Sequence, residues 1–209
     1  MSQPSQPAPS NPQPLLTVGV VADTHIPDRV GTLHPQLIPV LRAAGVGHIL
    51  HAGDVCVPGV LDELTQVAPV TAARGNRDIL LSSLPLVETI RLAGVEIALM
   101  HGHGGLFFYL WDKWQFMFFG YNFKRYVRLL THSSGSARVV IFGHTHRHEI
   151  SWQDGKLLFN PGAAGMIYDE PFTPSVGLLH IYPQQQVRAE IVPLSGYLVR
   201  GRQWVAKPE

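Results

Sequence analysis

Residues 15–78 read LLTVGVVADTHIPDRVGTLHPQLIPVLRAAGVGHILHAGDVCVPGVLDELTQVAPVTAARGNRD, and this stretch decides the fold. Short apolar runs of strand length alternate in it with longer helical patterns. The pattern predicts three strands with two helices between them: strands over Leu15–Ala22, His48–Ala52 and Val70–Ala73, and helices over Leu33–Ala44 and Val57–Val67. Strands joined by crossover helices run parallel, because each helix carries the chain back to the start of the next strand.

The later part of the sequence has a different pattern. Two pairs of apolar runs are separated by dipeptides typical of tight turns, Ala93-Gly94 and Asp154-Gly155. We therefore predict two β-hairpins, Val87–Leu92 with Val95–Met100 and Glu149–Trp152 with Lys156–Phe159. Further strands are predicted over Ala137–Phe142, Val176–Ile181 and Val187–Pro193. The expected fold class is α/β, a sandwich that is parallel at the start and antiparallel later.

The composition favours one globular domain. The chain has 209 residues, of which 45% are hydrophobic, enough to bury a core. Residues Met1–Pro14 contain five prolines and no charged side chain, which predicts a disordered Pro-rich tail (1–14) ahead of a single domain over 15–209. The tail lacks the basic and apolar segments of a secretory signal. A single cysteine, Cys56, excludes an internal disulfide and favours a reducing, cytoplasmic location.

The charge of the chain argues against some classes of partner. Sixteen Lys and Arg residues stand against fifteen acidic ones, so the basic excess of a protein that binds nucleic acid by bulk electrostatics is missing. No apolar run reaches the about 20 residues of a transmembrane helix. Only 15% of residues are charged, below the roughly 25% of an average domain. A surface with so few charged residues suggests that another subunit covers part of it.

Short polar motifs follow five of the predicted strands. They are Asp23-Thr24-His25, Gly53-Asp54, Gly75-Asn76-Arg77-Asp78, His101-Gly102-His103 and Gly143-His144-Thr145-His146. Open α/β sheets place ligands outside the carboxyl ends of their strands, so we expect these motifs to meet at one site. The glycines before Asp54, Asn76 and His144 permit close or unusual backbone paths there.

The side chains in these motifs have the chemistry of metal ligands. Carboxylates, an amide and imidazoles suit divalent manganese, iron, zinc, nickel or cobalt better than a soft, thiolate-preferring metal. Seven candidates are too many for one tetrahedral zinc, but they suit two ions that share a carboxylate. The candidates are Asp23, His25, Asp54, Asn76, His101, His144 and His146.

The motifs, in this order, resemble those of the calcineurin-like metallophosphoesterases. Residues 51–78, and NPGAAG at Asn160–Gly165, are most similar to the small single-domain phosphodiesterases of bacteria and archaea. The resemblance covers roughly Thr17 to Pro193. It implies a four-layer αββα sandwich of two facing mixed sheets, with a two-metal site at one edge.

The resemblance also implies a ligand set. Asp23, His25, Asp54 and His146 would bind the first ion, and Asp54, Asn76, His101 and His144 the second, with Asp54 bridging. His101, which precedes a glycine as the family's ligand does, is preferred to His103. Two divalent cations, manganese first among the compatible metals, would lower the pKa of a bridging water and give hydroxide for in-line attack on the phosphorus of a small phosphate ester.

One position departs from the family pattern. Many members have histidine after the G-N motif, where this chain has Arg77. Arg77 could bind a phosphoryl oxygen, or it could be a surface or salt-bridged side chain, with Asp78 as a candidate partner. If Arg77 binds the phosphoryl group, the leaving group would be protonated by water, by His103 or not at all, which favours an activated phosphodiester. We therefore consider Asn76, Arg77 and His103 as candidate catalytic residues.

The sequence is compatible with alternatives for the function of the fold and for the role of one segment. The fold is also used as a protein-binding platform by a retromer subunit, so a weakly active or inactive scaffold is the alternative to an enzyme. The segment is residues 106–130, LFFYLWDKWQFMFFGYNFKRYVRLL, an aromatic-rich and helical insertion interrupted by Gly120. It could pack on the sheet, cover the substrate, bind a membrane surface or form an oligomer interface. We expect about half of its aromatic side chains to be left for the interface of a homo-oligomer.

Overall fold

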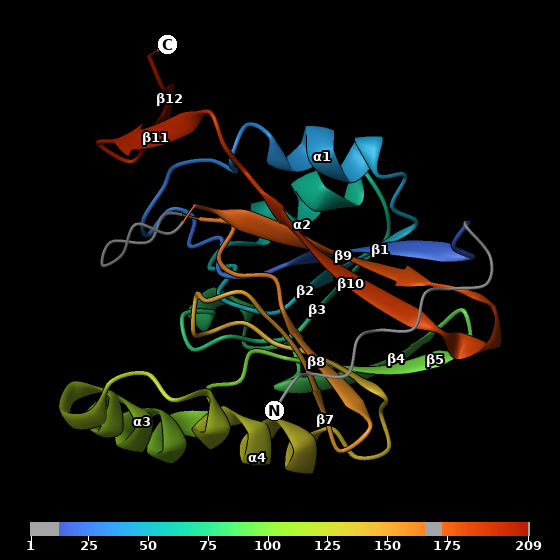
Figure 1. Cartoon of the computed structure of the whole chain (residues 1–209). Coiled ribbons are helices and arrows are strands. Elements are labelled where there is room, and N and C mark those ends of the chain that lie inside the picture. Colours follow the sequence, from blue (N-terminus) through green and yellow to red (C-terminus); the bar gives the residue numbers. More distant parts are fainter. Residues whose placement is uncertain (1–12, 166–172, 209) are drawn as a thin grey trace.

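A computed structural model describes residues 13–165 and 173–208 (Figure 1). For residues 106–109, 112, 113 and 116 it describes the backbone alone. Most of the predicted Pro-rich tail therefore lies outside the described residues.

The first sheet contains the three parallel strands predicted from residues 15–78. These are β1 (Leu16–Val21), β2 (His48–His51) and β3 (Val70–Ala72). Two later strands, β9 (Ser175–Ile181) and β10 (Val187–Pro193), extend it in antiparallel fashion on the other side of β1. The order β10-β9-β1-β2-β3 confirms a mixed sheet.

The second sheet contains both predicted hairpins. Its strands are β4 (Val87–Leu92), β5 (Val95–Met100), β6 (Val139–Ile141), β7 (Glu149–Gln153) and β8 (Lys156–Asn160), in the order β4-β5-β6-β8-β7. The turn residues Ala93, Gly94, Asp154 and Gly155 all have positive φ angles, between 43° and 83°. A positive φ at both central residues is what the type I′ two-residue hairpin turn requires, and this turn fixes the register of each pair.

The two sheets face each other across the main core, where Val20, Leu50, Leu99 and Phe159 are fully buried. Helices α1 (Leu37–Ala43) and α2 (Pro58–Thr65) cover the outer face of the first sheet, and α4 (Phe123–Ser133) covers that of the second (Figure 1). The predicted four-layer αββα sandwich is therefore confirmed. Single 3₁₀ turns occur at Ile79–Leu81 and Pro183–Gln185.

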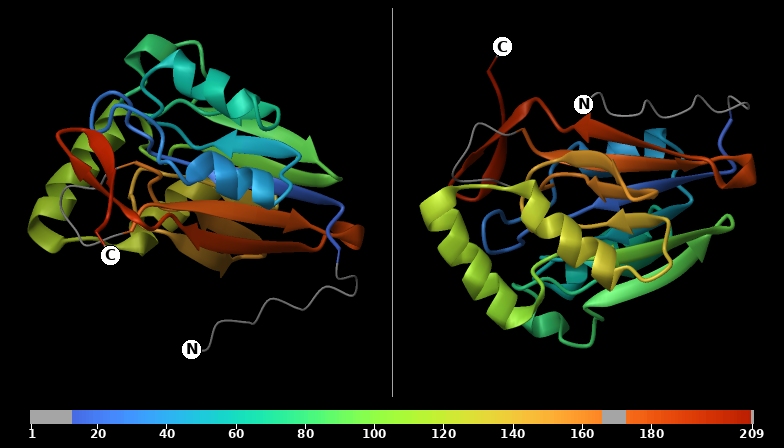
Figure 2. Two further views of the ribbon diagram at one scale, coloured as in Figure 1. Left: turned by 90° about the horizontal axis from the view of Figure 1, so that it is seen from above. Right: turned by 60° about the horizontal axis from the view of Figure 1, so that its bottom comes forward.

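The aromatic-rich insertion forms two helices. Helix α3 (Gly105–Phe119) ends at Gly120, whose φ of 67° stops the helix, and α4 begins after Asn122, whose side chain accepts a hydrogen bond from the backbone N–H of Lys124. Tyr126 and Leu130 of α4 are buried against the second sheet. Helix α3 projects past α4 to one side (Figures 1 and 2). None of the described helices is long and apolar enough to cross a membrane.

Two differences from the predicted elements have physical causes. The helix predicted from Leu33 begins at Leu37, because Pro35 disfavours helical backbone at His34, whose Nδ1 accepts the N–H of Gln36 in a turn. The second difference is a hairpin that was not predicted, β11 (Tyr197–Arg200) with β12 (Gln203–Ala206). It is held by Trp204, whose indole N–H donates to the carbonyl of Thr32.

Candidate metal centre

The five polar motifs meet at one edge of the sandwich, as predicted. Each begins within three residues of the end of its strand, and the two sheets both contribute. Asp23, His25, Asp54 and Asn76 follow strands of the first sheet. The histidines His101, His144 and His146 follow β5 and β6 of the second. The site therefore spans the interface between the sheets.

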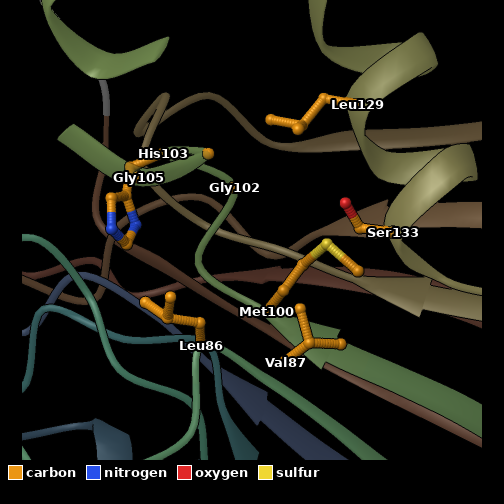
Figure 3. Close-up of a pocket in the computed structure, with 9 residues that line it drawn as sticks. Leu86, Val87, Met100, Gly102, His103, Gly105, Leu129 and Ser133 are labelled. Carbon is orange, nitrogen blue, oxygen red and sulfur yellow. The ribbon is translucent and has the colours of Figure 1, made fainter. Parts of the chain in front are cut away.

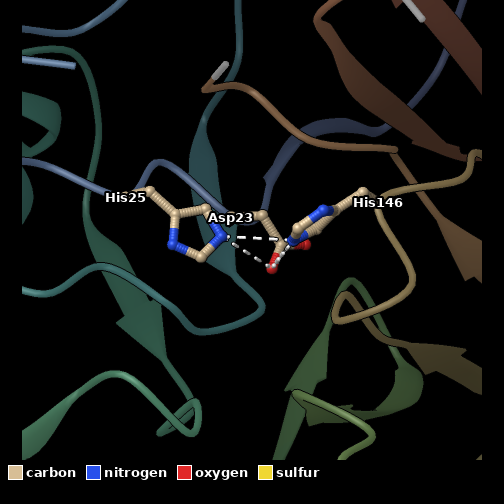
Figure 4. Close-up of side chains that lie close together, drawn as sticks. All are labelled: Asp23, His25 and His146. Atoms are coloured by element: carbon tan, nitrogen blue, oxygen red, sulfur yellow. Dashed lines mark hydrogen bonds and ion pairs between the residues drawn. The ribbon is translucent and has the colours of Figure 1, made fainter. Parts of the chain in front are cut away.

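Asp23, His25 and His146 form one compact group of potential ligands (Figure 4). Nε2 of His146 lies 3.4 Å from Oδ1 of Asp23, and Nε2 of His25 lies 3.8 Å from the same oxygen. The two Nε2 atoms are 3.2 Å apart. The ring nitrogens and the carboxylate oxygen thus converge on one point, the arrangement a divalent cation needs.

Asp54 lies between this group and a second one. Its Oδ2 is 3.7 Å from Nε2 of His25, and its Oδ1 is 3.4 Å from Nε2 of His101. Asp23, Asp54 and His101 also lie close enough together to hold an ion. The two oxygens of one carboxylate therefore face imidazoles from different halves of the site.

Asn76, His101 and His144 complete the second group. The amide oxygen of Asn76 is 3.0 Å from Nε2 of His101 and 3.1 Å from Nδ1 of His144. Nδ1 of His101 donates to the carbonyl of Ala52 at 2.8 Å, which orients the ring and points Nε2 at the shared site. All seven predicted ligands are thus brought together.

Burial and mutual charge control protonation in the site. Desolvation opposes ionisation of Asp23, but the surrounding histidines, His146 first, outweigh it and hold its pKa well below the usual range. Desolvation lowers the pKa of His25 to about 3 and that of His144 well below 6.5, so both rings are neutral at pH 7. Neutral imidazoles and an ionised carboxylate are the forms that bind a metal.

One buried atom tests whether this donor set fits a cation. Oδ1 of Asp23 is completely buried, yet within the described chain no group makes a hydrogen bond to it. The Nε2 atoms of His146 and His25 lie 3.4 and 3.8 Å from it. A buried carboxylate oxygen that accepts no hydrogen bond is costly, and a cation at the convergence point would satisfy it. The residues therefore fit a divalent metal.

Unusual backbone angles put the ligands in place. Five of the ligands have φ between 52° and 70°, a region that residues other than glycine rarely adopt: Asp23, His25, Asp54, His144 and His146. Backbone hydrogen bonds to the carboxylates maintain these angles: the N–H of His144 donates to Asp23, and that of Arg77 to Asp54. Strained positions that cluster at one site mark function.

Two glycines are required by close approach. A Cβ on Gly75 would overlap the carboxylate and the backbone amide of Asp54. A Cβ on Gly143 would lie 2.8 Å from Oδ2 of Asp23 and 2.9 Å from the carbonyl of Ala52. Gly75 therefore lets two loops of the first sheet touch, and Gly143 lets a loop of the second sheet touch loops of the first, which confirms the prediction of close backbone paths.

Two residues, Asp78 and Asn160, support the site in ways that the sequence did not predict. The carboxylate of Asp78 accepts the backbone N–H groups of Asp54, Cys56 and Gly75, which ties the loops after β2 and β3 together. Asn160 at the end of β8 donates to the carbonyl of Gly143 and so braces the last motif. Their positions in the sequence could have indicated these roles, since Asp78 ends the third motif and Asn160 directly follows the predicted strand Lys156–Phe159.

Arg77 and His103 lie at the margin of the site. The side chain of Arg77 is half exposed and pairs with Asp28 at 3.0 Å, so the pairing with Asp78 considered from sequence is wrong. The ring of His103 lies 5.4 Å from that of His101 and 6.3 Å from that of His144. Desolvation, reinforced by His101, lowers the pKa of His103 to about 4, so its imidazole is neutral at pH 7.

Comparisons with known proteins agree with this geometry. Residues 16–182 match the sequence profile of the calcineurin-like phosphoesterase superfamily domain. A probable metallophosphoesterase of Methanothermobacter thermautotrophicus is 30% identical over 178 residues, which is 85% of this chain and 92% of the relative.

Solved structures share the fold. Vps29 from Entamoeba histolytica, in complex with Zn²⁺, is 25% identical, with a TM-score of 0.62 over 86% of this chain and 100% of that one. An archaeal phosphodiesterase gives a TM-score of 0.59 at 20% identity, over 85% of this chain and 100% of that one.

Proposed function

Because the chain belongs to the calcineurin-like phosphoesterase superfamily, we propose that it is a phosphodiesterase that depends on two divalent metal ions. The observation that carries the proposal is the position of Asp54, whose two carboxylate oxygens face histidines of two different groups. A carboxylate between two sets of ligands is the expected bridge of a two-metal hydrolase.

The ligands divide between the ions by distance. Asp23, His25 and His146 would hold the first ion with one oxygen of Asp54, and Asn76, His101 and His144 would hold the second with the other. Bound divalent ions supply a nucleophile at neutral pH and neutralise charge on a phosphoryl group. Manganese is our first choice, while iron, zinc, nickel or cobalt suit the same donors.

Three residues would act on the substrate, a small phosphate ester: Asn76 within the metal centre, and Arg77 and His103 at its margin. Asn76 would act as a ligand of the second ion, since its amide oxygen lies 3.0 Å from Nε2 of His101 and 3.1 Å from Nδ1 of His144, and the three atoms point to the same place. The Arg77 guanidinium, half exposed, can exchange its contact with Asp28 for a phosphoryl oxygen. The neutral ring of His103 lies beside the second group of ligands and would contact the side of the leaving group.

Hydrolysis of bis-p-nitrophenyl phosphate tests the proposal. We expect turnover with Mn²⁺, loss of turnover after treatment with a chelator, and recovery when Mn²⁺ is added back. Elemental analysis of protein saturated with Mn²⁺ should find two ions per chain. One ion or none would refute the two-metal assignment, and Mn²⁺-loaded protein without turnover would leave the scaffold as the better description.

The scaffold alternative rests on a specific surface. Helix α3 exposes six apolar side chains: Leu110, Trp111, Trp114, Met117, Phe118 and Phe119. Apolar surfaces of this kind mark sites of protein contact. An inactive protein would use this surface, rather than the metal centre, as its functional feature.

We propose that a second copy of this chain covers the same six side chains, and that the homo-oligomer is most simply a twofold dimer in the cytoplasm. Phe107, Phe108, Tyr109 and Phe116, also predicted to contribute, have side chains outside the described residues. Tyr121, Phe123 and Tyr126 are at least partly buried and pack toward the second sheet. Sedimentation should therefore show a dimer at micromolar concentration, and Phe118→Asp with Phe119→Asp should convert it to a monomer. A 23.0 kDa wild-type monomer would contradict the proposal.

A further inference from the structure

A pocket lies beside the candidate metal centre, between the start of the β4–β5 hairpin and helix α4 (Figure 3). Its volume is about 230 Å³. The lining residues are Leu86, Val87, Met100, Gly102, His103, Gly104, Gly105, Leu129 and Ser133. Figure 3 shows the side chains of Met100 and Val87 rising from the two strands toward Leu129 and Ser133 on α4.

The lining of the pocket is mostly apolar. Four of its side chains are aliphatic or thioether groups, three positions are glycine, and none is charged. The two polar side chains, Ser133 and His103, lie at different ends of the pocket (Figure 3). A pocket of this kind binds an apolar group, because transfer of apolar surface out of water is favourable and no buried charge has to be matched.

The pocket and the metal centre share a wall. Met100 of the pocket directly precedes the ligand His101, and His103 follows it by two residues. The ring of His103 stands 5.4 Å from the ring of His101 and borders the pocket on its other side. Its Nδ1 is buried, and no described residue makes a hydrogen bond to it. A ligand that occupies both places would pass His103 and could satisfy this atom.

We propose that this pocket binds an apolar substituent of the substrate, an alkyl chain or an aryl ring, while the phosphoryl group lies at the metal centre. The substrate class is then a phosphoester of a hydrophobic alcohol or phenol. The size fits one substituent, because pockets that enclose a whole drug-sized ligand exceed about 300 Å³. This inference rests on the proposed function for the placement of the phosphoryl group.

Binding of two phosphonates to Mn²⁺-loaded protein tests the inference without requiring turnover. Hexylphosphonate and methylphosphonate have the same charged head and differ by five methylene groups. Each methylene that is fully buried strengthens binding by about fourfold. We expect hexylphosphonate to bind at least about tenfold more tightly by titration calorimetry.

Variants that fill the pocket test whether the preference for hexylphosphonate arises there. Ser133→Phe places a ring in the pocket from α4, and Val87→Trp does so from β4. His132→Phe is the matched control, since His132 neighbours Ser133 on α4 but is exposed and does not line the pocket. Both filling variants should bind the two phosphonates about equally, whereas the control should keep the wild-type preference. Thermal unfolding would verify that each variant is folded.

Two results would overturn the inference. One is equal affinity of the wild-type protein for both phosphonates, and the other is a preference for hexylphosphonate that survives both Ser133→Phe and Val87→Trp. A preference that behaves as expected, in protein that does not hydrolyse bis-p-nitrophenyl phosphate, would support the pocket and refute the catalytic proposal.

Discussion

The ligand-bearing loops have irregular backbone and buried side chains, whereas helix α3 has regular backbone and exposed ones. Asp23 and His25 are at most 1% exposed although both have positive φ, while Phe118 and Phe119 are 62% and 71% exposed on a continuous helix. The loops keep their strained angles because carboxylates accept backbone N–H groups from neighbouring loops. Regular secondary structure is therefore a poor guide to which part of this protein tolerates change.

The largest effect is expected at Asp54. Asp54→Ala should lower kcat/KM for bis-p-nitrophenyl phosphate by at least about a thousandfold, because the side chain that faces both groups of ligands is lost. Metal content should fall at both sites, whereas His146→Ala should mainly empty the first. Cys56→Ser, two residues away, is the control and should stay active. Near-normal hydrolysis by Asp54→Ala would show that the bridging assignment is wrong.

Asp78 tests whether the loops are held as rigidly as their hydrogen bonds suggest. Asp78→Ala should lower the free energy of unfolding by at least about 3 kcal/mol, because it leaves three backbone N–H groups in or near the core without their acceptor. Denaturation with urea measures the change. Asp62→Ala, on the exposed side of α2, should stay within about 0.5 kcal/mol of wild type. A similar loss of unfolding free energy in Asp78→Ala and Asp62→Ala would show that the hydrogen bonds of Asp78 do not stabilise the loops.

Arg77 lies in one of the ligand-bearing loops, but its side chain is half exposed at the surface. Arg77→Ala should reduce kcat/KM by roughly ten- to a hundredfold, the scale of one charge-assisted contact with a substrate oxygen. The melting temperature should hardly move, since the exposed ion pair with Asp28 contributes little. Asp28→Ala breaks the same pair without removing the guanidinium and should retain activity. Unchanged kinetics for Arg77→Ala would assign it a surface role.

The smallest effect is expected on the pH dependence of the unfolding free energy. It tests whether a histidine outside the ligand loops, His34, contributes to the loss of stability in acid. Burial against the β11–β12 hairpin lowers the pKa of His34 to about 4. The unfolded chain takes up this proton near pH 6.5 but the folded protein does not, so stability is lost as the pH falls from about 6.5 toward 4. His34→Phe should flatten the dependence of the unfolding free energy on pH in this window. The same slope in the variant would contradict the assignment.

The sequence was sufficient where a local rule decides the structure. Tight-turn dipeptides predicted both hairpins, and polar residues at strand ends predicted the site, because parallel strands end at one edge. The pairing of side chains that are far apart in the sequence was harder to predict. The partner of Arg77 is Asp28, 49 residues away, and only the path of the loop after β1 brings the two together.

The terminal hairpin shows another limit. Strands β11 and β12 are short and half exposed, so their apolar pattern is weak, and the turn at Gly201-Arg202 was the signal available. Its position depends on contacts of Trp204 with Thr32 and His34, which lie about 170 residues earlier in the chain. Contacts of this range follow from the assembled fold and leave no mark in local sequence.

The division of the ligands between the sheets has a thermodynamic consequence. An ion held by Asp23 and His146 joins residues 123 positions apart and links the two halves of the sandwich across their interface. Such an ion would act as a reversible cross-link, because opening the sheets would require its release. Ligands that bind the folded form alone add about 2.7 kcal/mol at a hundred times their dissociation constant. The lifetime of the folded chain would then follow the concentration of free metal around it, and scarcity of the metal would limit the amount of protein as well as its activity.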